Sequence, residues 1–311
     1  MDVTLQSSVL ETLYPTPPTG RACNGRLIVD FIAESFKLPL LQPFFNVNGN
    51  QPKELGQGVN YAVIGSSALD SAALEARGVH NFLTNASLRV QLEWFRQSIC
   101  ADISDCSHSI EDSLIFMSQT GMNDYLDALF GGKSISEVRS YVPFVVEAII
   151  SSTNELIELG AKTVLVPGTL PMGCGALILQ FYHGFDKSEY DNQTRCLFRI
   201  NKVAEYHNEL LVKELNKTRE LHPDKNIIYA DIYNAAMQFY RYPNRYGFTS
   251  GALKECYSLL DMSLCDEPDT HACWDGLHLT EAAYKIISNS LLQGSYTVPP
   301  FNLTCATSSS M

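Results

Sequence analysis

The sequence predicts an α/β fold in which helices cover a mostly parallel sheet in three layers. Short apolar runs rich in β-branched residues alternate along the chain with longer segments of helical periodicity. These runs are short and nearly continuous in their apolar character, which is typical of strands buried on both faces. The length of 311 residues allows one large α/β domain or two domains, and we expect a single domain over 1–311.

The first half of the chain begins with a loop and then alternates helix and strand. Residues 1–22 are dense in Pro, Thr and Gly, which favours a loop. Apolar residues at helical spacing follow from Leu27 to Phe36. The elements expected here are a helix at 24–36, a loop at 37–57, a strand at 60–64, a helix at 90–99 and a strand at 113–117.

The second half continues the alternation with longer helices. Pro143 lies inside the first of them and could kink it. Thr280 is a suitable N-cap for the last helix. The elements expected here are a helix at 136–159, a strand at 163–166, a helix at 197–221, a strand at 226–230 and a helix at 280–292.

Candidate site residues follow from this topology, because ligands of parallel sheets bind beyond the carboxyl ends of the strands. Asp275 and His278 are three residues apart in the segment before the last helix. This spacing lets the carboxylate reach the near imidazole nitrogen, select its tautomer and stabilise the imidazolium that forms when the ring takes a proton. The alternative is a surface histidine beside an unrelated acid, since an isolated D-x-x-H is a weak signal.

Asn123 and Gly65 are weaker candidates. Asn123 follows a glycine just past a strand, where its side-chain amide could donate to a developing oxyanion. Gly65 ends a strand, where the lack of a side chain lets the backbone N–H approach a ligand. For both residues an ordinary turn is the alternative.

Several segments together resemble the plant GDSL esterase/lipases of the SGNH-hydrolase superfamily, over essentially the whole chain. The segment 19–34 resembles the family's "PTGR…DGRLIIDFIAE", and 58–66 resembles "GANFAVGGA". The segment 166–174 resembles "VPG…PIGC", and 274–284 resembles "WDGxHxTEAAY". The branch that contains acetylajmalan esterase is the most similar in character.

The resemblance implies a flavodoxin-like, SGNH-type sheet and a role for each candidate residue. His278 would be the general base and Asp275 its orienting acid. Gly65, through its N–H, and Asn123, through its amide, would be oxyanion donors. Cys174 and Cys196 resemble a family disulfide, and two of Cys256, Cys265 and Cys273 could form another. No metal or cofactor is implied.

The sequence departs from the family pattern at the nucleophile. No Gly-Asp-Ser, the block that carries the family's serine, occurs in the chain. Ser7 and Ser8 lack the strand and glycine turn that would expose a nucleophile, so we expect neither to replace it. Ile64 stands where the family has a glycine, and Met122 within the Gly-x-Asn block could narrow the site. The chain is therefore expected to lack the family's first strand, a central one, whose loss would leave backbone groups unpaired at about 1–3 kcal/mol each.

The functional expectation is a carboxylic-ester hydrolase that acts on a small acylated plant metabolite or lipid ester by a Ser-His-Asp mechanism whose serine is missing from this chain. One alternative is a catalytically inactive relative that binds without turnover. The other is an acyltransferase that uses the same residues with an alcohol in place of water.

Composition narrows the partners and leaves the compartment open. The net charge of -12 and the absence of a basic stripe argue against nucleic acid. No apolar run has the length of a membrane span. We expect the protein to be a monomer. The start at Met1 lacks a signal peptide, which on its own indicates a cytoplasmic protein. The nine cysteines and the sequons at Asn85, Asn192, Asn216 and Asn302 suggest secreted or vacuolar relatives; the alternative is that the cysteines are buried free thiols.

Overall fold

The computed structural model describes residues 20–45, 57–81, 83–100 and 110–301, and its chain forms two compact units. The first unit comprises Met1–Asn60, Pro171–Lys202 and Tyr233–Ser290. The second comprises Tyr61–Leu170, Val203–Ile232 and Leu291–Met311. The single domain expected from the sequence stays a prediction.

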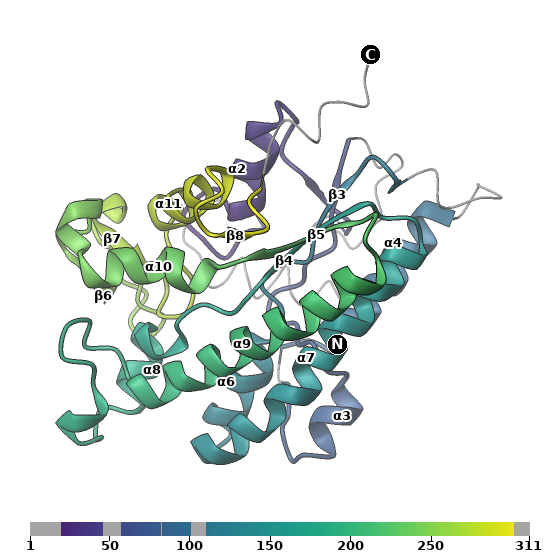
Figure 1. Cartoon of the computed structure of the whole chain (residues 1–311). Helices are drawn as coiled ribbons and strands as arrows, with labels where there is room; N and C mark the ends of the chain where they lie inside the picture. The colour runs from purple at the N-terminus through teal and green to yellow at the C-terminus, as the bar shows by residue number, and fades with distance from the viewer. Residues whose placement is uncertain (1–19, 46–56, 82, 101–109, 302–311) are drawn as a thin grey trace. The chain divides into compact units, whose positions relative to one another are not determined.

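The second unit is built on a four-stranded sheet of order β3-β4-β5-β8 (Figure 1). Strands β3 (Leu114–Phe116), β4 (Thr163–Pro167) and β5 (Asn226–Ala230) run parallel, and β8 (Thr297–Val298) pairs antiparallel with β5. In β4 and β5 every residue after the first is buried, without alternation. This pattern is that of a sheet covered on both faces, and it confirms the predicted α/β class.

Helices connect the strands of the second unit. The crossover from β3 to β4 contains α6 (Met122–Phe130) and α7 (Ile135–Glu158), and α9 (Phe198–Leu221) precedes β5. Helix α7 contacts both α6 and α4 (Leu88–Cys100). Ser134 caps α7 through a reciprocal pair of bonds with Glu137, and the helix continues through Pro143. A short helix, α3 (Ser71–Glu75), completes the unit among the residues described.

The first unit contains two small parallel strand pairs and several helices. Strands β1 (Gln42–Pro43) and β2 (Val59–Asn60) form one pair, and β6 (Gly251–Glu255) and β7 (His271–Cys273) form the other. Its helices are α2 (Ile28–Ser35), α8 (Ala176–Phe181), α10 (Ile232–Arg241) and α11 (Glu281–Leu292). A disulfide joins Cys174 to Cys196, as the family resemblance implied. Of the three cysteines left open for a second disulfide, Cys256 and Cys265 are joined and Cys273 is a buried free thiol.

Three predicted elements need correction. The expected loop at 37–57 contains the short strand β1, which pairs with β2. The expected strand at 60–64 ends at Asn60, because the Ser66 N–H donates to the Val63 carbonyl and closes a turn. The expected helix at 24–36 begins only at Ile28, because the Asp30 carboxylate accepts the Leu27 N–H and so sets the start of α2. The prediction of a missing first strand falls on the residues before Gly20, which lie outside the described part of the chain.

None of the helices in the ranges described is both long and apolar enough to cross a membrane.

Candidate active site

Asp275 and His278 lie in a short loop that joins β7 to α11 in the first unit. Backbone pairing closes the loop at its base. Cys273 and Leu279 form an antiparallel β-bridge, and the Trp274 N–H donates to the His278 carbonyl at 2.8 Å. The Thr280 N–H donates to the Ala272 carbonyl at 3.0 Å. The two ends of the loop are thus held together independently of its side chains.

Gly276 occupies the tip of this loop with a φ of +94°, a conformation that favours glycine. Its carbonyl accepts the Leu177 N–H at 3.0 Å, so the loop is tied to the start of α8. A Cβ at this position would lie 3.1 Å from both Leu177 and Glu255. Glycine therefore allows the chain to turn tightly between the aspartate and the histidine.

The Asp275 carboxylate accepts three hydrogen bonds from its own loop. One oxygen accepts the backbone N–H groups of Leu277 and His278 at 3.1 and 2.7 Å. The other lies 2.7 Å from Nδ1 of His278. Because an ionised carboxylate only accepts, Nδ1 carries the hydrogen and Nε2 is left with its lone pair. The geometry therefore sets the tautomer that a general base requires.

Burial and charge act in opposite directions on His278. Burial of the ring lowers its pKa, but the charge of Asp275 and the hydrogen bond to it outweigh this effect, so the pKa of His278 is raised above 6.5. The Asp275 side chain is 3% exposed, whereas that of His278 is 33% exposed. Nε2 has no hydrogen-bond partner among the described residues. The dyad thus consists of a buried acid, Asp275, and a partly solvent-exposed base, His278.

Gly65 occupies the turn that follows β2, in the second unit. With Val63 as the first residue of the turn, Gly65 is the third, and its φ of +76° is the conformation that a type II turn requires there. Its carbonyl accepts the side-chain amide of Asn81 at 2.7 Å, and the Asn81 oxygen accepts the backbone N–H groups of Leu83 and Thr84. The Gly65 N–H has no partner in the part of the chain that the structure describes.

Asn123 is the second residue of α6, rather than part of a turn. Gly121 precedes the helix with a φ of +100°, and a Cβ there would lie 2.7 Å from Val145. The Asn123 amide donates to the Ser66 carbonyl at 2.8 Å. The structure therefore brings Asn123 next to the Gly65 turn and leaves its second amide hydrogen without a partner among the residues described.

Asp124 is a residue of this region that the sequence reasoning did not identify. It is fully buried, and its two carboxylate oxygens accept the Ala68 and Leu69 N–H groups at 2.8 and 2.9 Å. Burial raises its pKa to about 7. Asn123 and Asp124 thus bind the 66–69 loop to the first turn of α6. The available signal was an acid beside Asn123 just past a predicted strand, since such residues often accept backbone N–H groups.

Ile64 lies in the Gly65 turn, and Met122 opens α6 with its sulfur 2.8 Å from the Gln119 amide nitrogen. Their proposed narrowing of the site stays a prediction. Ser7 and Ser8 lie outside the described residues.

One group of possible metal ligands occurs in the described ranges, namely Cys256, Cys265 and His271, whose ligand atoms lie within 4.8 Å of one another. The two sulfurs form a disulfide, so neither is available as the thiolate that binds metal.

Comparison with known proteins identifies the family of the chain. The family model described as GDSL-like Lipase/Acylhydrolase matches residues 7–291. GDSL esterase/lipase At1g28570 of Arabidopsis thaliana is 44% identical over 308 residues, which cover 94% of this chain and 78% of the relative. GDSL esterase/lipase At1g28590 of the same plant is 43% identical over 311 residues, which cover 94% and 76%. With its parallel-rich sheet, the chain belongs to the GDSL-like lipase/acylhydrolase family, as its sequence motifs suggested.

Proposed function

We propose that this chain is a carboxylic-ester hydrolase in which His278 is the general base and Asp275 orients it. The observation that carries the proposal is the 2.7 Å contact between Asp275 and Nδ1 of His278, with Nε2 left open. The family supports ester hydrolysis in general, because its curated plant relatives are named esterase/lipases.

The proposed reaction follows the chemistry of acyl transfer. Nε2 of His278 removes the proton of a hydroxyl nucleophile, whose oxygen attacks the ester carbonyl. The negative charge of Asp275 stabilises the imidazolium that forms. The imidazolium then gives its proton to the leaving alcohol, and water cleaves the acyl intermediate by the same route. The nucleophile is not assigned to a residue, since no Gly-Asp-Ser occurs in the sequence.

Gly65 and Asn123 are proposed as the oxyanion donors. Both keep a hydrogen that donates to no described residue, although each is held by another of its polar groups. Donors that are held in place before the reaction stabilise developing charge without a cost of reorganisation. Asp124 supports this arrangement because it binds the loop that follows Gly65.

The proposed substrate is a small acylated plant metabolite or a lipid ester, bound by a monomer without a metal or cofactor. The net charge of -12 disfavours polyanionic partners such as nucleic acid. An acyltransferase would use the same groups with an alcohol in place of water.

A second candidate is a protein that binds esters without turnover, which the lack of a Gly-Asp-Ser in the sequence favours. Hydrolysis of p-nitrophenyl acetate by the purified chain distinguishes the two. We expect turnover that is lost in His278→Ala and kept in His183→Ala, a matched change at an exposed histidine. A fluorophosphonate label should mark the nucleophile. Folded protein with neither turnover nor label would refute hydrolysis by this chain and support the binding function.

A further inference from the structure

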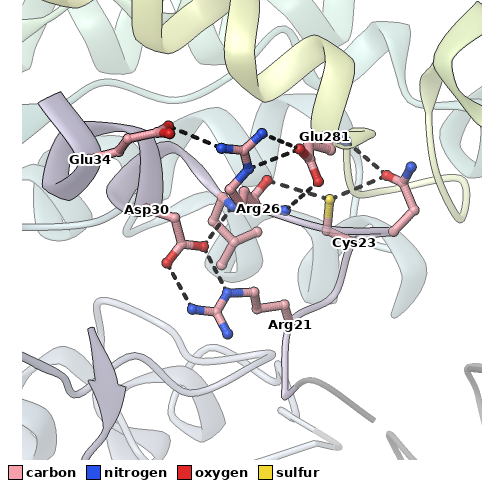
Figure 2. Close-up of polar contacts among 8 residues, drawn as sticks. Arg21, Cys23, Arg26, Asp30, Glu34 and Glu281 are labelled. Atoms are coloured by element: carbon pink, nitrogen blue, oxygen red, sulfur yellow. Dashed lines mark hydrogen bonds and ion pairs between the residues drawn. The ribbon is translucent and has the colours of Figure 1, made fainter. Parts of the chain in front are cut away.

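The segment 24–26 contacts Glu281, the first residue of α11, which lies far from it in sequence (Figure 2). Two nitrogens of the Arg26 guanidinium lie 2.9 and 2.8 Å from one oxygen of Glu281. The Arg26 backbone N–H donates to the other oxygen at 2.9 Å. Both oxygens of Glu281 are therefore bound by the same residue.

Two neighbours of Arg26 complete this contact. The side-chain oxygen of Asn24 accepts the backbone N–H of Glu281 at 2.8 Å. That N–H is among the first of α11, and such groups have no partner within their own helix. Gly25 lies so close to the Glu281 carboxylate that a Cβ there would overlap it. We call Asn24, Gly25 and Arg26 the clasp.

The residue that the clasp holds is three positions beyond His278. Between them, Thr280 caps α11 by accepting the Ala283 N–H, and its hydroxyl donates to the His271 carbonyl at 2.7 Å. The Leu279 N–H donates to the Tyr284 hydroxyl of α11 at 3.3 Å. The loop with the dyad therefore ends on the first turn of α11, and a shift of that turn would move the His278 backbone relative to Asp275.

We propose that Asn24 and Arg26 are positioning residues for the Asp275–His278 dyad, and that they act by holding Glu281 and the start of α11. The proposal rests on the proposed role of His278 as the base. Neither residue is assigned a contact with substrate. Their effect is to keep the His278 N–H and Nδ1 at 2.7 Å from the two oxygens of Asp275.

The pKa of His278 reports this positioning, because the hydrogen bond to Asp275 helps to raise it. Any direct effect of losing the Arg26 charge would be to raise the pKa of His278, since a cation disfavours a second positive charge. Loosening of the dyad would lower it. The two effects thus have opposite signs in Arg26→Gln, and Asn24→Ala changes no charge at all.

Glu34 offers a matched control for Arg26. Its carboxylate lies 3.0 Å from the same guanidinium, but it is 62% exposed and belongs to α2 rather than to α11 (Figure 2). Glu34→Gln therefore removes one of the two ion pairs of Arg26 while the clasp on Glu281 remains.

The test is the pKa of His278 in the full chain, measured by nitrogen NMR of histidine-labelled protein, with unfolding temperature as a check of folding. We expect Asn24→Ala and Arg26→Gln to lower it by about 0.5 unit or more, and Glu34→Gln to leave it unchanged. Arg26→Lys keeps the charge but loses the pair of guanidinium nitrogens that binds Glu281, so it should lower the pKa of His278 less than Arg26→Gln does. A pKa that rises in Arg26→Gln and stays constant in Asn24→Ala would overturn the proposal, as would an equal shift in Glu34→Gln.

This measurement needs no turnover, so it separates the two proposals. If the chain proves inactive but the pKa shifts as expected, the clasp holds the dyad and only the catalytic role fails. If turnover depends on His278 but the clasp variants keep its pKa, the positioning proposal fails alone.

Discussion

Replacing Asp275 by Asn is the change that tests the dyad most directly. The variant keeps the shape of the side chain, and its oxygen can still accept the Leu277 and His278 N–H groups. Its amide nitrogen would then face Nδ1 of His278 and donate to it. The imidazole would carry its hydrogen on Nε2, so it could no longer take a proton there.

The size of the effect follows from what Asp275 supplies. A hydrogen bond to a charged group is worth about 1.5–3 kcal/mol, and about 1.4 kcal/mol corresponds to one pKa unit, so the pKa of His278 should fall by about 1–2 units. Because 33% of the side chain is exposed and solvent screens the interaction, we expect the lower end. Loss of a general base slows a reaction by roughly 100- to 10,000-fold, and we expect kcat to fall within that range.

The assay combines the NMR titration of His278 with ester turnover, beside Asp269→Asn as a control at an exposed acid of the same unit. Burial also acts on the imidazole, and without Asp275 it is unopposed. The pKa should therefore fall below 6.5 in Asp275→Asn and stay unchanged in Asp269→Asn. An unchanged pKa in Asp275→Asn would refute the reasoning, since it would mean that the carboxylate does not interact with the ring in solution.

Three further outcomes are expected. Gly121→Ala should lower the free energy of unfolding in urea by about 2–5 kcal/mol, because the new Cβ is strained by the positive φ and also overpacks against Val145. Gly132 has a φ of +83° and open space around it, so Gly132→Ala should lower the free energy by only about 1–2 kcal/mol. Replacing both Cys174 and Cys196 by Ser should cost about 3 kcal/mol in the same assay, as expected for a crosslink of sequence separation 22; an equal stability would contradict it. Because the pKa of His278 is raised, its protonation should abolish turnover as the pH falls through a midpoint above 6.5; a midpoint below 6.5 would be inconsistent with the dyad.

Much of the second unit could be predicted from the sequence. Continuous apolar runs predicted β4 and β5, and the bounds of β5 are those expected. In the first unit, Thr280 was expected to cap α11 and does so through the Ala283 N–H. These elements follow from local chemistry, that is, from burial along a short strand or from one side chain and the backbone that it caps.

The elements that were missed depend on contacts between distant parts of the chain. Strand β2 ends early because a turn around Gly65 follows it, and the Gly65 carbonyl is held by Asn81, sixteen residues later. Helix α6 was not predicted, and a turn was the alternative for Asn123, because Gly, Asn and Asp favour turns when taken alone. In the structure those polar groups bind the 66–69 loop instead, a contact that no local pattern reveals.

His278, Asn123 and Gly65 each show the same pattern of bonding. His278 uses Nδ1 to bind Asp275 and keeps Nε2 open, Asn123 uses one amide hydrogen on Ser66 and keeps the other, and Gly65 binds through its carbonyl and keeps its N–H. Each residue has two hydrogen-bonding groups and uses one of them in a bond within the protein. The committed bond removes the rotational freedom that an unbound side chain or loop would lose on meeting substrate. The unbonded group therefore points in a fixed direction. A substitution that keeps this group but breaks the bond within the protein should be as informative as removal of the residue itself.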